Sequence, residues 1–188
     1  MVLALLTASL VSIVCFLITV VMGFMMAGRA GLGQHFLFGF FTTFLVALAQ
    51  SMTMFYFIGT GKQVKDLVLN HPAGKEFIKR TKMFKNEVFP PATWAILFTM
   101  ATMIMGGGVD TRVIPTFVHT LLAAAALYFN VVAFWREGKY MIEHNMLMED
   151  LDRLLQAISP SVGPTGRSSA GAPAAPASLT GPSAGSPH

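Results

Sequence analysis

Two histidines, His35 and His119, are the residues whose type and position could support chemistry. His35 opens one apolar segment, residues 36–58, and His119 lies about one turn inside another, residues 113–135. Ionisable side chains at membrane depth tend to face other helices and often mark function. Two imidazoles on facing helices could bind the iron of a b-type haem as axial ligands. They could also form part of a metal site or protonate a quinone.

The same two histidines also have ordinary structural roles. His35 could be hydrated among lipid headgroups, and His119 could hydrogen-bond to a neighbouring helix. Their expected depths differ by about 6–9 Å at 1.5 Å per helical residue, and helix tilt could close or widen this gap. We therefore treat a haem b or quinone site at His35 and His119 as a hypothesis. Since the sequence has no other suitable histidine pair, at most one bis-histidine haem is expected.

The remaining polar residues carry no enzymatic motif. The sequence has no HExxH, nucleophile elbow or di-iron ExxH pair, and its single cysteine allows no internal disulfide. No acidic residue lies deep inside a predicted span, which argues against an ion or proton relay. Gln50, Thr53 and Asn130 are expected to form interhelical hydrogen bonds. We therefore expect no independent catalytic activity.

Composition and hydropathy indicate the elements that must position the histidines. The 188-residue chain is 54% hydrophobic and 12% charged, whereas soluble domains are roughly 25% charged. A helix needs about 20 apolar residues to cross the hydrocarbon core, and a spanning segment must satisfy its own backbone hydrogen bonds. The sequence therefore predicts an all-α integral membrane protein, with four transmembrane helices in an up-down bundle. The expected spans are about residues 2–26, 36–58, 88–109 and 113–135.

The distribution of positive charge predicts the orientation of this bundle. Eleven of the 13 Lys and Arg residues lie between the second and third spans or after the fourth. The other two, Arg29 and Arg112, occupy the two short loops on the opposite side. The basic side is expected to be cytoplasmic, which places both termini in the cytoplasm. The expected location of the protein is the cell (inner) membrane. The lipid bilayer is the first expected partner, and nucleic acid is not expected.

Helical periodicity continues beyond the predicted spans. Residues 61–87 predict a cytoplasmic helical hairpin, which together with the spans makes one membrane domain over residues 1–158. Gly59 and Gly61 are expected to weaken the joint to the second span, and Pro90-Pro91 to mark the entry to the third. The Pro-, Ala-, Gly- and Ser-rich residues 159–188 predict a disordered tail.

Residues 136–158 predict a cytoplasmic helix that continues the fourth span. Met148, Leu151 and Leu155 form an apolar stripe on it, near heptad spacing. Such a stripe is expected to be buried against another surface. That surface could be the helical hairpin, a protein partner or a second copy of the chain.

Two classes of function fit this sequence. The first is a non-catalytic subunit or scaffold of a membrane complex, favoured by the lack of a reactive motif and by the projecting helices. The second is an electron-transfer membrane subunit, in which His35 and His119 hold a b haem that is linked to quinone. The outline is similar to small membrane anchors of respiratory complexes, but likeness of outline alone does not imply function. On the sequence alone, the first class needs fewer assumptions.

Overall fold

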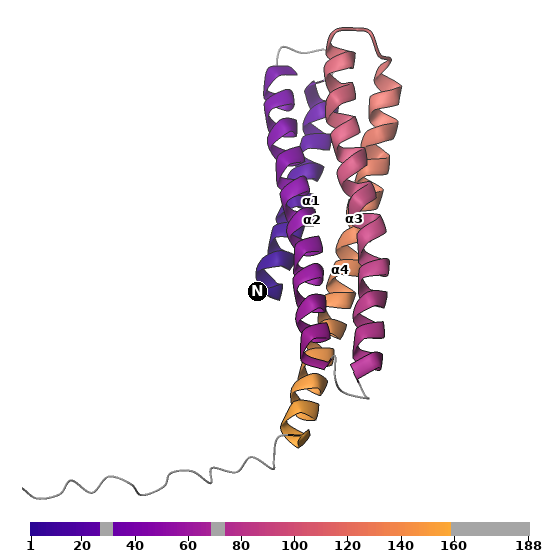
Figure 1. The fold of residues 1–188 in the computed structure, drawn as a ribbon. Coiled ribbons are helices and arrows are strands. Elements are labelled where there is room, and N and C mark those ends of the chain that lie inside the picture. The colour runs from indigo at the N-terminus through magenta and orange to yellow at the C-terminus, as the bar shows by residue number, and fades with distance from the viewer. Residues whose placement is uncertain (27–31, 69–73, 159–188) are drawn as a thin grey trace, which may run out of the picture. The chain divides into compact units, whose positions relative to one another are not determined.

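The computed structural model describes residues 1–26, 32–68 and 74–158, and this part is helical without strands. The helices are α1 (Val2–Met26), α2 (Leu32–Val68), α3 (Gly74–Asp110) and α4 (Thr116–Ile158) (Figure 1). Each is long and apolar enough to cross a membrane. The predicted all-α fold with four candidate spans is therefore confirmed, while sidedness stays a prediction. The contacts that position the candidate site lie within one compact unit, Met1–Asp152.

Three predicted segments lie outside the described residues. They are the loop that contains Arg29, the turn of the expected hairpin at 69–73, and the tail over 159–188. The other short loop is described, and it shows how α3 ends. The amides of Val113 and Ile114 both donate to the carbonyl oxygen of Gly108, and Arg112 adopts a left-handed backbone with φ of 60°.

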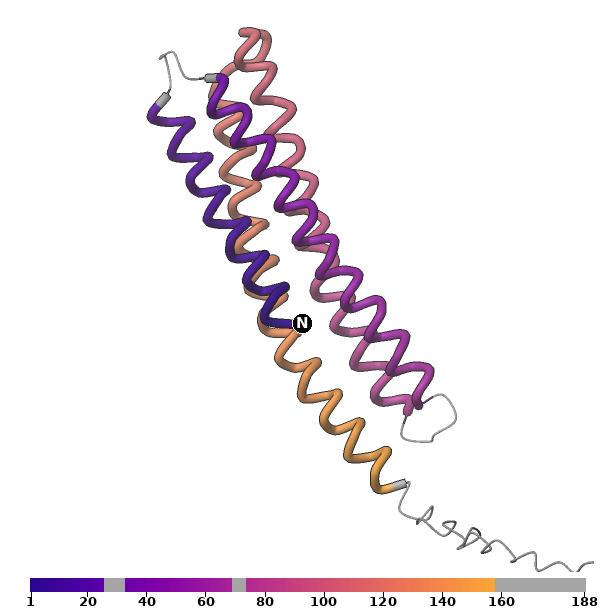
Figure 2. Tube along the Cα trace, turned by 90° about the vertical axis from the view of Figure 1, so that its left-hand side faces the viewer, coloured from indigo at the N-terminus to yellow at the C-terminus, as the bar shows by residue number. Residues whose placement is uncertain are grey.

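Each of α2 and α3 is one helix through the positions where the sequence suggests a joint. α2 continues through Gly59 and Gly61, and α3 continues through Pro90 and Pro91. The two helices run side by side (Figure 2), and Pro91 is buried in α3 together with Ala92 and Ala95. The packing around Pro91 offsets the loss of the backbone hydrogen bonds that prolines cannot make. The described residues within 61–87 are therefore the ends of α2 and α3.

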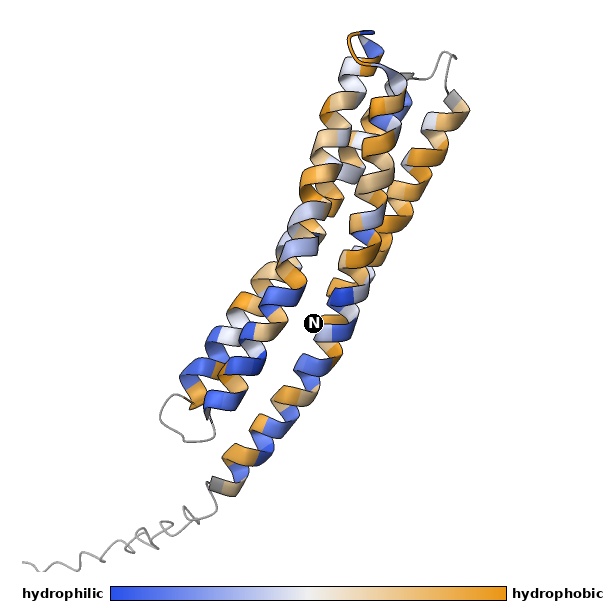
Figure 3. Ribbon diagram, turned by 90° about the vertical axis from the view of Figure 1, so that its right-hand side faces the viewer, coloured by the Kyte–Doolittle hydropathy of each residue, from blue (hydrophilic) through white to orange (hydrophobic). Residues whose placement is uncertain are grey.

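α4 is a single helix from Thr116 to Ile158, as the periodicity of the sequence predicts. Its 43 residues correspond to about 64 Å at 1.5 Å per residue, roughly twice the thickness of a hydrocarbon core. Figure 3 shows mainly apolar residues along the half of the helices nearer the α3–α4 turn. The other half carries many hydrophilic residues.

The interior differs between these two halves. In the apolar half, the buried side chains are mostly small or polar, whereas large side chains such as Phe40, Phe44 and Phe117 are exposed. This distribution suits helices that pack closely together in lipid. In the other half, Phe84, Met141 and Leu147 are fully buried, as in the core of a water-soluble protein.

Two glycine substitutions test the continuity of α2 and its packing at the turn to α3. A Cβ at Gly59 would meet nothing within 4 Å, so Gly59→Ala should stabilise the helix by about 0.5–1 kcal/mol. A Cβ at Gly74 would overlap the backbone carbonyl of Val68, so Gly74→Ala should destabilise the protein by about 1–3 kcal/mol. Thermal unfolding in detergent, followed by circular dichroism, measures both. A loss of stability in Gly59→Ala would contradict a continuous α2.

Candidate functional site

α2 and α4 bring the two predicted site histidines together. The ring centroids of His35 and His119 are 6.4 Å apart, and the ring planes are perpendicular at 90°. The sequence leaves open whether the two residues approach each other, because their positions along the helices suggest different depths. The packing of the helices removes this difference.

Each imidazole ring lies against a glycine on a further helix. A Cβ at Gly23 of α1 would lie 3.0 Å from Cε1 of His35, and one at Gly106 of α3 would lie 3.2 Å from Cε1 of His119. Both distances are shorter than ordinary van der Waals contact, so only glycine leaves each ring its present position. All four helices therefore meet at this site. The sequence suggests close packing at residues 106–108 but does not identify Gly23 or Gly106 as the partners of the histidines.

Each histidine has a buried ring nitrogen without a hydrogen bond of good geometry, and the backbone of Thr19 on α1 lies beside His35. The Nδ1 atoms of His35 and His119 are buried and have no hydrogen-bond partner in the described part of the chain. A buried polar atom without a partner typically costs about 1–3 kcal/mol. A bound ligand or water molecule at these nitrogens would remove that cost.

The spacing of the two rings suits a single ion between them. A bond from a metal to an imidazole nitrogen is about 2.0–2.1 Å, and the nitrogen lies about 1 Å from the ring centre. Two imidazoles on opposite sides of one ion therefore have ring centres roughly 6 Å apart. The described residues contain no group of three His, Cys, Asp or Glu side chains that could hold an ion. A haem iron needs only two axial ligands from the protein, so the two histidines are the side chains that could hold one.

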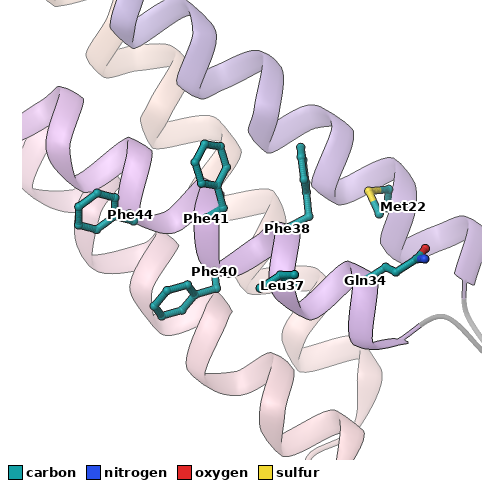
Figure 4. A pocket seen from close by; sticks show the side chains of 7 residues that line it. All are labelled: Met22, Gln34, Leu37, Phe38, Phe40, Phe41 and Phe44. Atoms are coloured by element: carbon teal, nitrogen blue, oxygen red, sulfur yellow. The ribbon is translucent and has the colours of Figure 1, made fainter.

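An apolar groove on the outward side of α2 does not belong to this site. It is lined by Leu37, four phenylalanines and Gln34 of α2 together with Met22 of α1, and His35 is not among these residues (Figure 4). Phe40, Phe41 and Phe44 are each more than half exposed. In a membrane these side chains would contact lipid.

A second buried polar cluster surrounds Glu137 of α4. This side chain is fully buried, and its Oε2 accepts a hydrogen bond of 2.8 Å from Oγ of Ser9 on α1. Its Oε1 has no partner among the described residues. Gln50 of α2 lies beside it without a hydrogen bond of good geometry, and the Oγ1 atom of Thr53 is also buried without a partner.

The expected interhelical hydrogen bonds are therefore only partly present. Nδ2 of Asn130 donates to Oγ1 of Thr99 on α3 at 3.0 Å, as predicted. The prediction for Thr53 is wrong for the described residues, since its Oγ1 makes no hydrogen bond there. The amide of Gln50 lies beside Glu137 of α4, but the geometry falls short of a hydrogen bond. Both side chains are nevertheless fully buried, so their polar groups point into the interior and not toward lipid.

Sequence reasoning missed Glu137, although its spacing gives a signal. Residues 119, 130, 137 and 144 are separated by 11, 7 and 7 positions, which are close to three, two and two helical turns. These four polar residues therefore share one face of α4. In the sequence, the charged Arg136 marks the end of the predicted span, so sequence reasoning assigns Glu137 to the segment outside the membrane. In the structure, Arg136 points outward and pairs with Glu87 of α3 at 2.7 Å.

The partners of Glu137 place it near the edge of the apolar half. At 1.5 Å per residue, Ser9 lies about 26 Å from the far end of α1, and Gln50 lies about 27 Å from the start of α2. Both values are close to the roughly 30 Å of a hydrocarbon core. The expectation that no acid lies inside the bundle at membrane depth therefore overlooks this carboxyl group.

The three residues of the predicted interaction stripe differ in how far they are buried. Leu151 is fully buried inside the unit Met1–Asp152, and Met148 is partly buried. Leu155 is also partly buried, but it lies after that unit. In contrast, Ile142 and Met146 are 56% and 59% exposed on the same helix, so they are the larger apolar side chains that α4 leaves uncovered there.

Comparison with known proteins gives no match to a protein-family model, a curated protein or a solved structure. We therefore infer function from the geometry of the two polar clusters.

Two neighbouring glycines test the packing of the histidine pair. Gly106→Ala places a methyl group against His119, whereas Gly107→Ala meets nothing within 4 Å. We expect Gly106→Ala to shift the NMR signals of the His119 imidazole and, through the ring contact, those of His35. Gly107→Ala should leave them within the spread of repeated measurements. Equal shifts in the two variants would contradict the contact between His119 and Gly106.

Proposed function

We propose that this chain is an electron-transfer subunit of the cell membrane, in which His35 and His119 bind one b-type haem as axial ligands. The observation that supports this most directly is the 6.4 Å separation of the two ring centroids, which suits one iron between two imidazoles. When bound, the haem would supply a one-electron carrier. A quinone is the proposed electron partner, because it dissolves in the hydrocarbon around the helices.

The residues around the pair would hold and orient the ligands. The half-buried imidazoles come from α2 and α4, which lie far apart in the sequence, so the bundle fixes their separation. Gly23 and Gly106 leave room for the rings, and side chains there would push the ligands away from each other. Second-shell contacts of this kind orient a ligand and tune the metal.

The proposed membrane placement follows the charges. The helices would run up and down, with the basic ends of α2 and α3, the extension of α4 and both termini in the cytoplasm. The histidine pair would then lie near the opposite surface of the membrane. The large buried side chains in the hydrophilic half, such as Phe84 and Leu147, support a segment that is packed outside the hydrocarbon.

An optical spectrum of the protein, purified in detergent from haem-replete cells, tests this function. We expect a sharp alpha band of the b type after reduction with dithionite. His35→Ala and His119→Ala should each remove it, because either change deletes an axial ligand. Gly107→Ala, which touches neither ring, should keep it. A colourless wild-type protein would overturn the proposal.

A second candidate is a non-catalytic subunit, and one observation favours it. Val131, Trp135, Ile142 and Met146 are all exposed, and their spacing of four, seven and four residues puts them on one face of α4. Ile142 and Met146 lie beyond the predicted span, where lipid does not account for their exposure. Stripes of this spacing pair helices with one another, so the proposed occupant is a second copy of this chain.

Native mass spectrometry from detergent tests this pairing. The double variant Ile142→Asp with Met146→Asp should lose a dimer that the wild-type protein forms, because two charges would be buried at the contact. A charge-matched control, Asn145→Asp with Gln156→Asp, adds the same two negative charges at exposed positions of α4, leaves the apolar stripe intact and should keep the dimer. Leu151→Asp is unsuitable, since Leu151 is buried inside its own chain. A monomeric wild-type protein would contradict this candidate.

A further inference from the structure

We propose that Glu137, with Ser9, Gln50 and Thr53, forms a buried proton-binding site that exchanges its proton through bound water. The site is separate from the histidine pair and does not depend on haem binding. It joins three helices, because Ser9 belongs to α1, Gln50 and Thr53 to α2, and Glu137 to α4. All four side chains are fully buried.

The unpartnered polar atoms carry this inference. Oε1 of Glu137, both amide atoms of Gln50 and Oγ1 of Thr53 lack a hydrogen-bond partner among the described residues. Buried polar side chains are nearly always satisfied by protein or by ordered water. A buried water typically makes two to four hydrogen bonds to groups of this kind. The cluster offers both donors and acceptors, and water is the small ligand that can use both.

The donors in the cluster favour a proton over a metal cation. Ser9 directs its hydroxyl hydrogen at Glu137, and the Nε2 group of Gln50 can only donate. A hard cation such as Ca²⁺ takes about six to eight oxygen ligands, and a single carboxylate with two such donors does not provide them. A carboxyl group that receives one hydrogen bond and keeps one oxygen free can accept and release a proton without moving its neighbours.

No charge in the described residues pairs with Glu137. The titratable groups closest to the cluster along each helix are the Met1 amino group and Cys15 on α1, Tyr56 and Lys62 on α2, Glu87 on α3, and Arg136, Lys139 and His144 on α4. Arg136 is already paired with Glu87 on the outward side. Since burying an unpaired ion costs several kcal/mol, a bound proton is the available means of neutralising this carboxyl group.

His144 provides a further proton-carrying group toward the hydrophilic end. It follows Glu137 by two helical turns on the same face of α4 and is almost fully buried. Its ring lies between those of Tyr56, Phe57 and Phe84, at centroid distances of 5.6, 6.0 and 6.1 Å. Neither ring nitrogen has a partner in the described part of the chain. His144 is therefore a second buried titratable group on the same face of α4.

Infrared difference spectroscopy of the full chain in lipid nanodiscs tests the site. A pH step should produce a carbonyl band of a protonated carboxyl group that shifts in D₂O, because the proton exchanges with solvent. Glu137→Gln should remove the band, and Glu143→Gln, which changes a more exposed carboxyl group on the same helix, should keep it. Ser9→Ala should shift the frequency of the band, since the carboxyl group loses its hydrogen bond. Thr7→Ala, on the exposed side of α1, should not.

The outcomes separate the proposal from its alternatives. If Glu137→Gln fails to fold, the band shift in Ser9→Ala against its Thr7→Ala control still decides. A spectrum without a carboxyl band that responds to these variants would overturn the proposal. A band whose pH midpoint moves when Na⁺ replaces choline at constant ionic strength would also overturn it, in favour of a metal cation. None of these results depends on whether the protein contains haem.

Discussion

The absence of water from the hydrocarbon core is the constraint on which the structure depends. Helices satisfy the backbone internally, but polar side chains within the bundle must still find partners. In the described residues, every buried side-chain polar atom without a hydrogen bond lies on α2 or α4. These two helices therefore carry the buried polar groups that have no partner, while α1 and α3 contribute hydroxyl groups such as those of Ser9 and Thr99. The histidine pair and the Glu137 cluster are two places along α2 and α4, which links both proposals to one feature of the packing.

Small residues make this arrangement sterically possible. Glycines on α1 and α3 face the imidazole rings, and alanines such as Ala49, Ala95 and Ala126 are buried between the helices. Close backbone approach is a usual basis of helix association in lipid. Apolar side chains gain little there by exchanging contacts with lipid for contacts with one another. Large aromatic side chains such as Phe40, Phe44 and Phe117 are instead exposed on the outside, so in the apolar half the bundle keeps polar groups inside and bulky side chains toward lipid.

The sequence predicted the elements well and the interior less well. Apolar runs and periodicity indicated four helices and the length of α4. Gly59 and Gly61 suggested a weak joint and Pro90-Pro91 an entry point, but α2 and α3 are continuous through these residues. Asn130 forms the expected interhelical bond, whereas Gln50 and Thr53 do not. Leu151 was expected in a stripe that packs against another surface, and it is buried within its own compact unit.

Length, hydropathy and charge by themselves determined that the chain is helical and has four segments able to cross a membrane. The hydropathy and length of a segment depend only on its own consecutive residues, so they can be read from the sequence. Only the tertiary structure decided which side chains meet. Helix tilt and rotation brought His35 to His119, placed Gly23 and Gly106 against their rings, and turned Glu137 inward while Arg136 faces outward. Those angles are set by contacts between residues far apart in sequence, and no local pattern specifies them.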